Sequence, residues 1–400
     1  MLEFSDSSFS LLGDYNATYS SKPSRIFDPL FVEFLSDLSS EIMKSPGAKE
    51  FPDLISFAFW GRHSNLVKIE RNYPKSELRF GLGRVLHITP KNVPMNFAFS
   101  WALSALAGNS NFVKLPSNNF PQIELFLYFF TQTAKNFKYQ KFLDSVVFFR
   151  TEHDSHLIKE LSRMSEARVI WGSNKTIDAL KKFEVQPRVV DLTFPSRISV
   201  SVISASPFLD LSSTKQEIIV QKFLQDSLSF GQRGCSSPRK IFWVGTKDDF
   251  VTARNRFWNL ANTLSSKLIQ MPDSFTRFSN LSILATNAQR DFTLSSSIYD
   301  SLIVLESLQN PENDFETILS FGTFVEKRID RIDETLGDET RNLQTVTYFG
   351  LDPEIIVSSI EESGFLGVDR IVPFGSAFDM TPSWDGVDTI RSLSRVIEIR

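Results

Sequence analysis

The sequence predicts an α/β protein built on a doubly wound parallel sheet. Short apolar segments alternate with helical patterns between residues 84 and 183, and such alternation is typical of parallel strands covered by helices on both faces. A further helix and strand follow over residues 214–244. A chain of 400 residues normally divides into two or more domains, each with its own core.

The composition is that of an ordinary soluble protein and excludes several classes. Apolar residues make up 42% of the chain and its formal net charge is −4, so nothing suggests the basic surface that binds nucleic acid. The sole cysteine excludes an internal disulfide and a multi-cysteine metal site, and no further ligand lies near the pair His153 and His156. The start lacks a signal peptide, and no apolar run approaches the ~20 residues of a membrane span. We therefore expect a cytoplasmic protein without a metal site.

The first eighty residues predict two helices and an exposed arm. Residues 1–26 are polar, and we expect them to form a loose lead-in. A helix begins at Asp28, a capping residue followed by proline, and its buried stripe extends to Ile42. A second helix is expected over Pro52–Trp60. Residues 67–80 alternate polar and apolar side chains around a turn, which predicts an exposed hairpin.

From residue 81 the pattern becomes strand, helix, strand. Strands are expected at Arg84–Thr89, Asn111–Ser117, Ser145–Phe149 and Arg168–Trp171. Helices are expected through Phe97 to Leu106, over the apolar run Ile123–Phe130, and over Thr176–Phe183. The apolar run is too short to span a membrane, so we expect it to pack on the sheet.

Polar residues follow three of these strands. Sheets of this kind bind ligands at the carboxyl ends of their strands, where helix N-termini suit phosphate. Asn92 offers an amide donor, Lys114 a cation and Ser117 a hydroxyl. Gly172 and Ser173 offer a tight turn and a cap for the next helix. Each of these features alone is ordinary turn chemistry.

The cysteine lies between a predicted helix and a predicted strand. Thr214 and Glu217 have capping-box spacing at the start of the helix, and Gly231 suits its end. The strand is expected over Ile241–Val244. The thiol of Cys235 is therefore on a tight loop, and its small neighbours leave room for a substrate carbonyl. This context leaves two interpretations open, a nucleophile or a small buried hydrophobe.

Taken together and in this order, the segments resemble the LuxC-type acyl-CoA reductases, a branch of the aldehyde dehydrogenase superfamily that supplies fatty aldehyde to bacterial luciferase. The resemblance covers roughly residues 50–400. The segments that carry it are GRVLHITPKNVP (83–94), LAGNSNFVKLPS (106–117), VIWGSNKTI (169–177), FGQRGCSSPRK (230–240), NLQTVTYFG (342–350), GVDRIVPFGSAFD (367–379) and WDGVDTIRSLSR (384–395). It implies an aldehyde-dehydrogenase-like fold with a doubly wound parallel-sheet cofactor domain, an α/β catalytic domain and a small β oligomerisation arm.

The resemblance also implies roles for individual residues. Cys235 is the nucleophile and Asn92 the amide of the oxyanion hole. The cofactor-binding residues are Lys114 and Ser117 at the adenosine ribose, Gly172 and Ser173 at the pyrophosphate or nicotinamide side, and Gln344 and Thr345 where related enzymes have a glutamate. A hydroxyl and a cation at the ribose favour NADPH, with NADH as an alternative.

The implied reaction is the reduction of a fatty acyl thioester, acyl-CoA or acyl-protein, to the aldehyde through an acyl-cysteine. Hydrolytic aldehyde dehydrogenases carry a glutamate base, whereas the corresponding stretch here, Asp191–Arg197, has no glutamate. Its absence protects the acyl-enzyme from water. The spacing before Cys235 is one residue longer than the superfamily's commonest, and the LuxC-type branch shares it. A nearby cation would lower the pKa of the Cys235 thiol. Arg233 or Arg239 could provide it, or these residues could have a surface or structural role.

The implied layout interleaves the domains. The predicted divisions are a cofactor domain at 1–66 and 80–196, a catalytic domain at 197–382, and an oligomerisation hairpin and strand at 67–79 and 383–400. An unpaired C-terminal strand would be a bare edge, which favours a homo-oligomer. The mixed-charge stretch Glu326–Arg341 is expected to be a solvated loop or helix. The expected partners are the thioester substrate and, as a candidate, an acyl-protein synthetase.

Two rival functions remain open. A cysteine acyltransferase or thioesterase would need a base near Cys235, and His87 lies on the strand before the Asn92 loop. A catalytically silent scaffold would keep the fold but would neither take an acyl group nor bind nucleotide.

Overall fold

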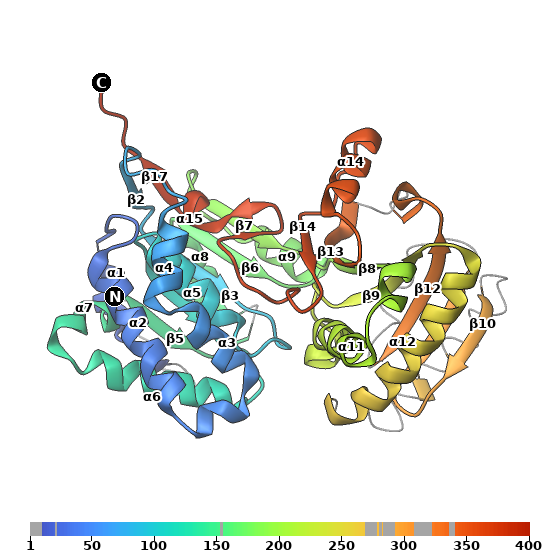
Figure 1. The fold of residues 1–400 in the computed structure, drawn as a ribbon. Coiled ribbons are helices and arrows are strands. Elements are labelled where there is room, and N and C mark those ends of the chain that lie inside the picture. The colour runs from blue at the N-terminus through green and yellow to red at the C-terminus, as the bar shows by residue number, and fades with distance from the viewer. Residues whose placement is uncertain are drawn as a thin grey trace. The chain divides into compact units, whose positions relative to one another are not determined.

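The computed structural model describes residues 10–20, 22–152, 155–268, 278–279, 282, 293–307, 322–335 and 341–400. The chain forms two compact units (Figure 1). Unit 1 is Met1–Pro195 together with Met380–Arg400, and unit 2 is Ser196–Asp379. His153 of the sequence analysis lies outside the described residues.

Unit 1 is organised around a sheet that, in the described part of the chain, has the strand order β1-β5-β4-β3-β6-β7. Its strands are β1 (Ser10–Leu12), β3 (Arg84–Ile88), β4 (Ser110–Lys114), β5 (Val146–Phe149), β6 (Ala167–Trp171) and β7 (Val190–Phe194). All neighbours pair in parallel except β1, which runs antiparallel to β5 at one edge. The predicted parallel sheet is therefore confirmed, but the expectation of a loose lead-in is wrong where residues 10–20 form β1 and a helix.

Helices cover both faces of this sheet. Its helices are α1 (Tyr15–Ser20), α2 (Pro29–Lys44), α3 (Pro52–Trp60), α4 (His63–Glu70), α5 (Asn96–Leu106), α6 (Pro121–Ala134), α7 (Gln140–Leu143), α8 (His156–Met164), α9 (Asn174–Lys181) and α15 (Thr389–Ser392), with short 3-10 turns η1 (Gly47–Glu50) and η2 (Phe137–Tyr139). Alternate strand residues face opposite ways, since Val146 and Phe148 join one hydrophobic cluster while Val147 and Phe149 join another.

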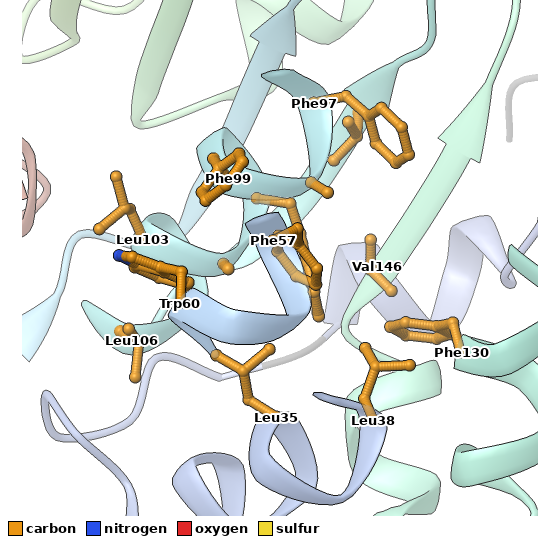
Figure 2. Packing of buried hydrophobic residues seen from close by; sticks show 14 of the residues in the cluster. Leu35, Leu38, Phe57, Trp60, Phe97, Phe99, Leu103, Leu106, Phe130 and Val146 are labelled. Atoms are coloured by element: carbon orange, nitrogen blue, oxygen red, sulfur yellow. The ribbon is translucent and has the colours of Figure 1, made fainter. Parts of the chain in front are cut away.

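The larger cluster is rich in aromatic rings. Figure 2 shows Phe57 of α3 among side chains of α2 and α5. Its ring centroid is 5.2 Å from that of Phe99 and 5.4 Å from that of Phe126, both in edge-on geometry. Edge-on pairs of this kind add to the stabilisation that burial of the rings provides. The cap at Asp28, which accepts a hydrogen bond from the Leu30 N–H, is as predicted.

The predicted hairpin at 67–80 is wrong. Residues 67–70 belong to α4, because Leu66 and Ile69 are spaced to share the buried face of a helix. The end of the stretch enters β2 (Arg79–Gly81), which pairs antiparallel with β17 (Ser394–Val396) near the C-terminus of the same chain (Figure 1). A further two-stranded sheet joins β15 (Ser383–Trp384) to β16 (Val387–Asp388).

Unit 2 contains a second sheet, with the order β10-β11-β12-β9-β8-β13-β14 among the described residues. Its strands are β8 (Ile198–Ser204), β9 (Pro238–Val244), β10 (Thr293–Ile298), β11 (Ile303–Ser307), β12 (Thr323–Ile329), β13 (Leu343–Phe349) and β14 (Arg370–Pro373). Only β10 runs antiparallel to its neighbour. The described helices are α10 (Ala205–Leu209), α11 (Ser213–Leu228), α12 (Lys247–Leu268) and α14 (Pro353–Ser363), with 3-10 turns η3 (Ser229–Gln232) and η5 (Ile332–Thr335).

The expectation of a solvated loop or helix from Glu326 to Arg341 is wrong where the stretch lies in β12, although Asp330 and Arg331 beyond that strand are exposed. Its start lies in β12, where Glu326 is fully buried. The Glu326 carboxylate pairs with Arg254 and accepts hydrogen bonds from the indole N–H groups of Trp243 (2.9 Å) and Trp258 (2.8 Å). Burial raises the pKa of Glu326 above its ordinary value, while these donors oppose the shift. The charge pattern of the sequence did not reveal partners that are far away in the chain.

Candidate active site

The cysteine lies on the loop that joins α11 to β9, as predicted. The helix ends at Leu228, and after Ser229 the residues Phe230, Gly231 and Gln232 have φ values of 54°, 65° and 62°. Gly231 takes the expected left-handed conformation, but the helix has already ended and the residues on both sides of Gly231 are left-handed too. Such a conformation is uncommon for phenylalanine and glutamine and has to be held by the surroundings. The predicted capping box is wrong, because the N-cap is Ser212 and its side chain makes no capping bond.

The side chain of Gln232 holds this strained turn. It is fully buried and donates hydrogen bonds to the carbonyls of Pro238 (3.3 Å) and Thr323 (3.1 Å). Its oxygen accepts from the N–H groups of Gly322 (3.0 Å) and Thr323 (3.3 Å). One amide thus joins the loop to the ends of β9 and β12. Arg239 donates to the Gln232 carbonyl at 3.2 Å and supports the same turn.

Two buried serines fix the backbone around the thiol. Ser199 of β8 donates to the carbonyl of Cys235 at 2.7 Å, and Ser236 donates to the side-chain oxygen of Gln344 at 2.7 Å. Cys235 itself is exposed. The interpretation of this cysteine as a buried hydrophobe therefore does not fit. An exposed sulfur on a fixed backbone is the arrangement that a nucleophile requires.

The two residues predicted on β13 lie beside this loop. Gln344 and Thr345 are both buried, and the Thr345 hydroxyl donates to the Gln344 side-chain oxygen at 3.3 Å. The structure therefore brings Gln344 together with the cysteine loop, through Ser236. No local sequence pattern indicates this contact, because the residues are more than one hundred positions apart.

Unit 1 brings its predicted site residues to one edge of its sheet. β4, β3 and β6 are parallel neighbours, so the residues after them share the carboxyl edge. The strand order reverses here, since the chain adds β4 and β5 on one side of β3 and then β6 and β7 on the other. Such a switch point is where sheets of this kind bind ligands. Asn92 follows β3 and is exposed.

The cation at this edge is largely withdrawn from water. Lys114, the last residue of β4, is 1% exposed, and desolvation lowers the pKa of its ammonium to about 8, although Glu152 partly offsets the effect. Ser117 beyond it is exposed. A buried ammonium that lacks full solvation gains strongly from an anionic ligand.

The turn after β6 is built as predicted. Ser173 is the N-cap of α9, and its hydroxyl accepts from the Thr176 N–H at 3.2 Å. A Cβ at Gly172 would lie 3.3 Å from the Thr176 side chain, so a glycine keeps this turn tight. The sequence analysis missed the neighbouring pair Trp171 and Phe194, whose rings stack at 3.9 Å at the ends of β6 and β7. Aromatic residues that end two strands were the available signal.

His87 does not serve as an accessible base. It is fully buried on β3, with Nδ1 2.8 Å from the Ser100 hydroxyl and Nε2 3.0 Å from the Asn111 side-chain oxygen. Desolvation lowers its pKa to about 4, so the ring is neutral at physiological pH. Both nitrogens have partners inside unit 1, and this removes the base that the thioesterase alternative named.

A comparison with known protein families identifies the class of enzyme. A family model described as acyl-CoA reductase (LuxC) matches residues 35–396. This chain belongs to the LuxC family of acyl-CoA reductases. It is thus an acyl-CoA reductase, as its resemblance implied. A search of curated protein sequences found no match.

Solved structures place the LuxC-family chain in the aldehyde dehydrogenase fold. Aldehyde dehydrogenase 21 from Physcomitrella patens, in complex with succinate, has a TM-score of 0.64 at 12% identity over 93% of this chain and 86% of its own. Glyceraldehyde-3-phosphate dehydrogenase GapN from Methanocaldococcus jannaschii, complexed with NADP, has a TM-score of 0.62 at 12% identity, over 92% and 88%. 1-Pyrroline-5-carboxylate dehydrogenase from Thermus with bound NAD has a TM-score of 0.63 at 10% identity, over 92% and 80%. The predicted aldehyde-dehydrogenase-like fold is confirmed.

Over the described ranges, no helix is both long and apolar enough to cross a membrane. The same part of the chain contains no group of three or more histidine, cysteine or acidic side chains placed to hold a metal ion.

Proposed function

We propose that this LuxC-family protein uses NADPH to reduce a fatty acyl thioester, acyl-CoA or acyl-protein, to the aldehyde through an acyl group carried on Cys235. The observation that carries the proposal is the exposed thiol on a backbone held by Ser199, Ser236 and Gln232. Unit 2 would act as the catalytic domain and unit 1 as the cofactor domain.

The Cys235 thiolate attacks the thioester carbon, and the carbon–sulfur bond to the leaving thiol breaks. The Asn92 amide and a loop N–H, that of Cys235, would stabilise the oxyanion that forms. After reduction the thiohemiacetal on Cys235 collapses, which releases the aldehyde and restores the thiolate. Overall one acyl thioester, one NADPH and one proton give one aldehyde, one thiol and one NADP⁺.

The edge of the unit 1 sheet fits a phosphorylated dinucleotide. Lys114 and Ser117 would hold the adenosine ribose, since a buried cation beside a hydroxyl suits a 2′-phosphate better than an acidic residue does. Gly172 and Ser173 directly precede α9, whose N-terminal N–H groups suit the pyrophosphate. Gln344 and Thr345 would lie toward the nicotinamide ribose. Bound NADPH supplies a hydride to the acyl carbon.

The segment that holds the base in hydrolytic relatives supports reduction over hydrolysis. Asp191 is the sole acid of residues 191–197, and both of its oxygens accept from Arg168, at 2.8 and 2.5 Å. Both oxygens are held by this buried guanidinium, and this geometry does not favour Asp191 as the base that activates water. Water is therefore not activated from this segment, and the acyl-cysteine can await reduction.

The proposal includes an assembly and a location. The two-stranded sheet of β2 and β17 offers a strand edge on which a second copy could pair, and we infer a homo-oligomer in the cytoplasm. An acyl-protein synthetase is the candidate protein partner for delivery of the acyl group. Sedimentation would show whether the chain is an oligomer, and a monomer at micromolar concentration would refute that part.

One assay tests the proposal against its rivals. Purified protein is incubated with acyl-CoAs of graded chain length, with NADPH, with NADH or with neither, and its intact mass and the aldehyde are measured. We expect acyl-protein without a nucleotide, and one aldehyde per NADPH oxidised. Free acid without aldehyde would indicate a thioesterase, and an unchanged protein mass would indicate a silent scaffold. Strict dependence on NADH would show that the ribose site is misplaced.

A further inference from the structure

A second loop packs directly on the loop that carries the cysteine. We call Phe374–Asp379, which follows β14, the cover loop. The Phe378 ring meets the Phe230 ring edge-on with centroids 5.3 Å apart. A Cβ placed on Gly234 would lie 2.8 Å from two carbons of the same ring. The residue immediately before Cys235 is therefore a glycine in contact with Phe378.

A buried carboxylate holds the cover loop from one side. Asp226 lies in the last turn of α11 and is 2% exposed. One of its oxygens accepts from the Gly375 N–H at 2.7 Å and the other from the Ala377 N–H at 2.9 Å. These bonds use both carboxylate oxygens on a single loop, and bonds to a charged acceptor are the stronger kind.

Arg370 holds the same loop from the other side. Its guanidinium donates to the carbonyls of Ala377 (2.8 Å) and Asp379 (2.9 Å). The N–H groups of the cover loop are thus held by the Asp226 carboxylate, and its C=O groups are held by the Arg370 guanidinium. Burial raises the pKa of Asp226 to about 6; the Asp379 charge adds to this shift, and the two N–H donors and Arg370 oppose it. The protein thus keeps an acid where a neutral residue would be easier to bury.

We propose that Asp226 is a positioning residue for the reaction at Cys235, because it holds the cover loop so that Phe378 remains against Gly234. The contact limits rotation of the peptide between Gly234 and Cys235, whose N–H is the proposed loop donor to the oxyanion. This inference rests on the proposed acyl transfer to Cys235. Asp226 touches no reacting atom and acts through Phe378.

The matched variants are Asp226→Asn, Phe378→Ala, their double variant and the control Glu217→Gln. Asparagine keeps the size of aspartate but has one acceptor oxygen, so one loop N–H loses its partner. Glu217 is an exposed acid on the same helix. The loss of one hydrogen bond to a charged group corresponds to roughly tenfold or more in the equilibrium of the held loop.

The rate of Cys235 acylation by an acyl-CoA is compared with the rate of its alkylation by iodoacetamide, both by intact mass. The chain has one cysteine, so each adduct has one site. We expect Asp226→Asn and Phe378→Ala each to slow acylation about tenfold, with alkylation, NADPH binding and the control little changed. The double variant should be no slower than either single one, since the two residues act in one chain of contacts. Two results would overturn the inference and indicate instead that the variants loosen the fold generally. One is an equal loss in the rates of acylation and alkylation, and the other is a double variant whose loss is the sum of the two single losses.

Hydrogen exchange separates this inference from the proposed function. Asp226→Asn should speed exchange at Gly375 and Ala377 and also in the segment around Gly234. Phe378→Ala should speed exchange only around Gly234. If the wild type takes no acyl group but this pattern holds, the proposed function falls while the coupling of the two loops stands. If Asp226→Asn leaves the Gly234 segment protected, the inference falls whatever the enzyme does.

Discussion

The two units position their functional residues by different means. In unit 1 the sheet topology positions them: Asn92 and Ser173 follow parallel strands and Lys114 ends one, so all three lie at one edge of the sheet. In unit 2 the cysteine is on an irregular loop, and side chains such as Gln232 hold it from other parts of the chain. A site residue in unit 1 should therefore be removable without loss of stability, whereas the supports in unit 2 should not.

The largest effect is expected at the buried charge of unit 2. Glu326→Ala would leave two indole N–H groups without their acceptor in the interior, and would leave Arg254 with Glu306 alone. Removal of one partner from a buried ion pair typically costs about 3–5 kcal/mol in the free energy of unfolding. Urea unfolding would measure the loss. A cost below about 1 kcal/mol would mean that this position is solvated, as the sequence alone suggested.

The next effect separates function from stability in unit 1. Asn92→Ala should slow both acylation and reduction by roughly 10²–10³, or about 3–4 kcal/mol in the activation barrier, because both steps develop charge on the same oxygen. NADPH affinity and unfolding free energy should barely change, since Asn92 is exposed. Pre-steady-state acylation, alongside a nucleotide titration, provides the test. A wild-type acylation rate would make Asn92 an ordinary turn residue.

Gln232 should show the opposite combination. Gln232→Ala removes the amide that joins the left-handed turn to β9 and β12 and leaves buried backbone groups unpaired. We expect a loss of about 2–3 kcal/mol in unfolding free energy together with slower acylation. The control Gln225→Ala changes an exposed glutamine on α11. If the two variants unfold alike, the backbone holds the cysteine loop without this side chain.

The smallest effect is a pH dependence of opposite sign in the two units. The pKa of His87 is about 4 in the folded state, against about 6.5 in the unfolded state. Between these two pH values the unfolded state therefore binds more protons than the folded state does. The contribution of His87 to stability is therefore present above pH 6.5 and lost as pH falls toward 4. The pKa of Asp226 is about 6 in the fold, above its ordinary value, so the folded state binds more protons and its contribution falls as pH rises from 4 to 6.

Each contribution is confined to its own pH window. Denaturant unfolding of the wild type, His87→Gln and Asp226→Asn from pH 4 to 7 would measure these contributions. They would appear as differences in the slope of the unfolding free energy against pH. The His87 variant should lose less stability on acidification than the wild type does. Asp226→Asn should lose the component that falls as pH rises. Parallel curves for all three proteins would contradict both assignments.

The sequence could predict what depends on local pattern and topology. Arg84–Ile88 and Val146–Phe149 are strands because their apolar runs are too short and too continuous for exposed helices, and the strand-end residues follow from that alternation. Family motifs then marked Cys235. The helix over His63–Glu70 was missed because a short segment with alternating polarity also fits a strand.

The sequence could not predict supports that depend on distant partners. Ser199 meets Cys235 across 36 positions and Asp226 meets Ala377 across 151, and no local pattern records such pairs. Glu326 was misjudged for the same reason, because a charge is read as solvated unless its partner is known. The residues that hold the cysteine loop are thus the part of the site that needs the three-dimensional structure.

The most direct test of the central claim is the mass of the protein after brief incubation with an acyl-CoA and no nucleotide. We predict that the wild type gains the mass of one acyl group, that peptide mapping locates it on Cys235, and that added NADPH removes it as aldehyde. Cys235→Ala should gain nothing while it still binds NADPH. Acylation at another residue, or aldehyde formation by Cys235→Ala, would contradict the claim that this thiol carries the acyl group.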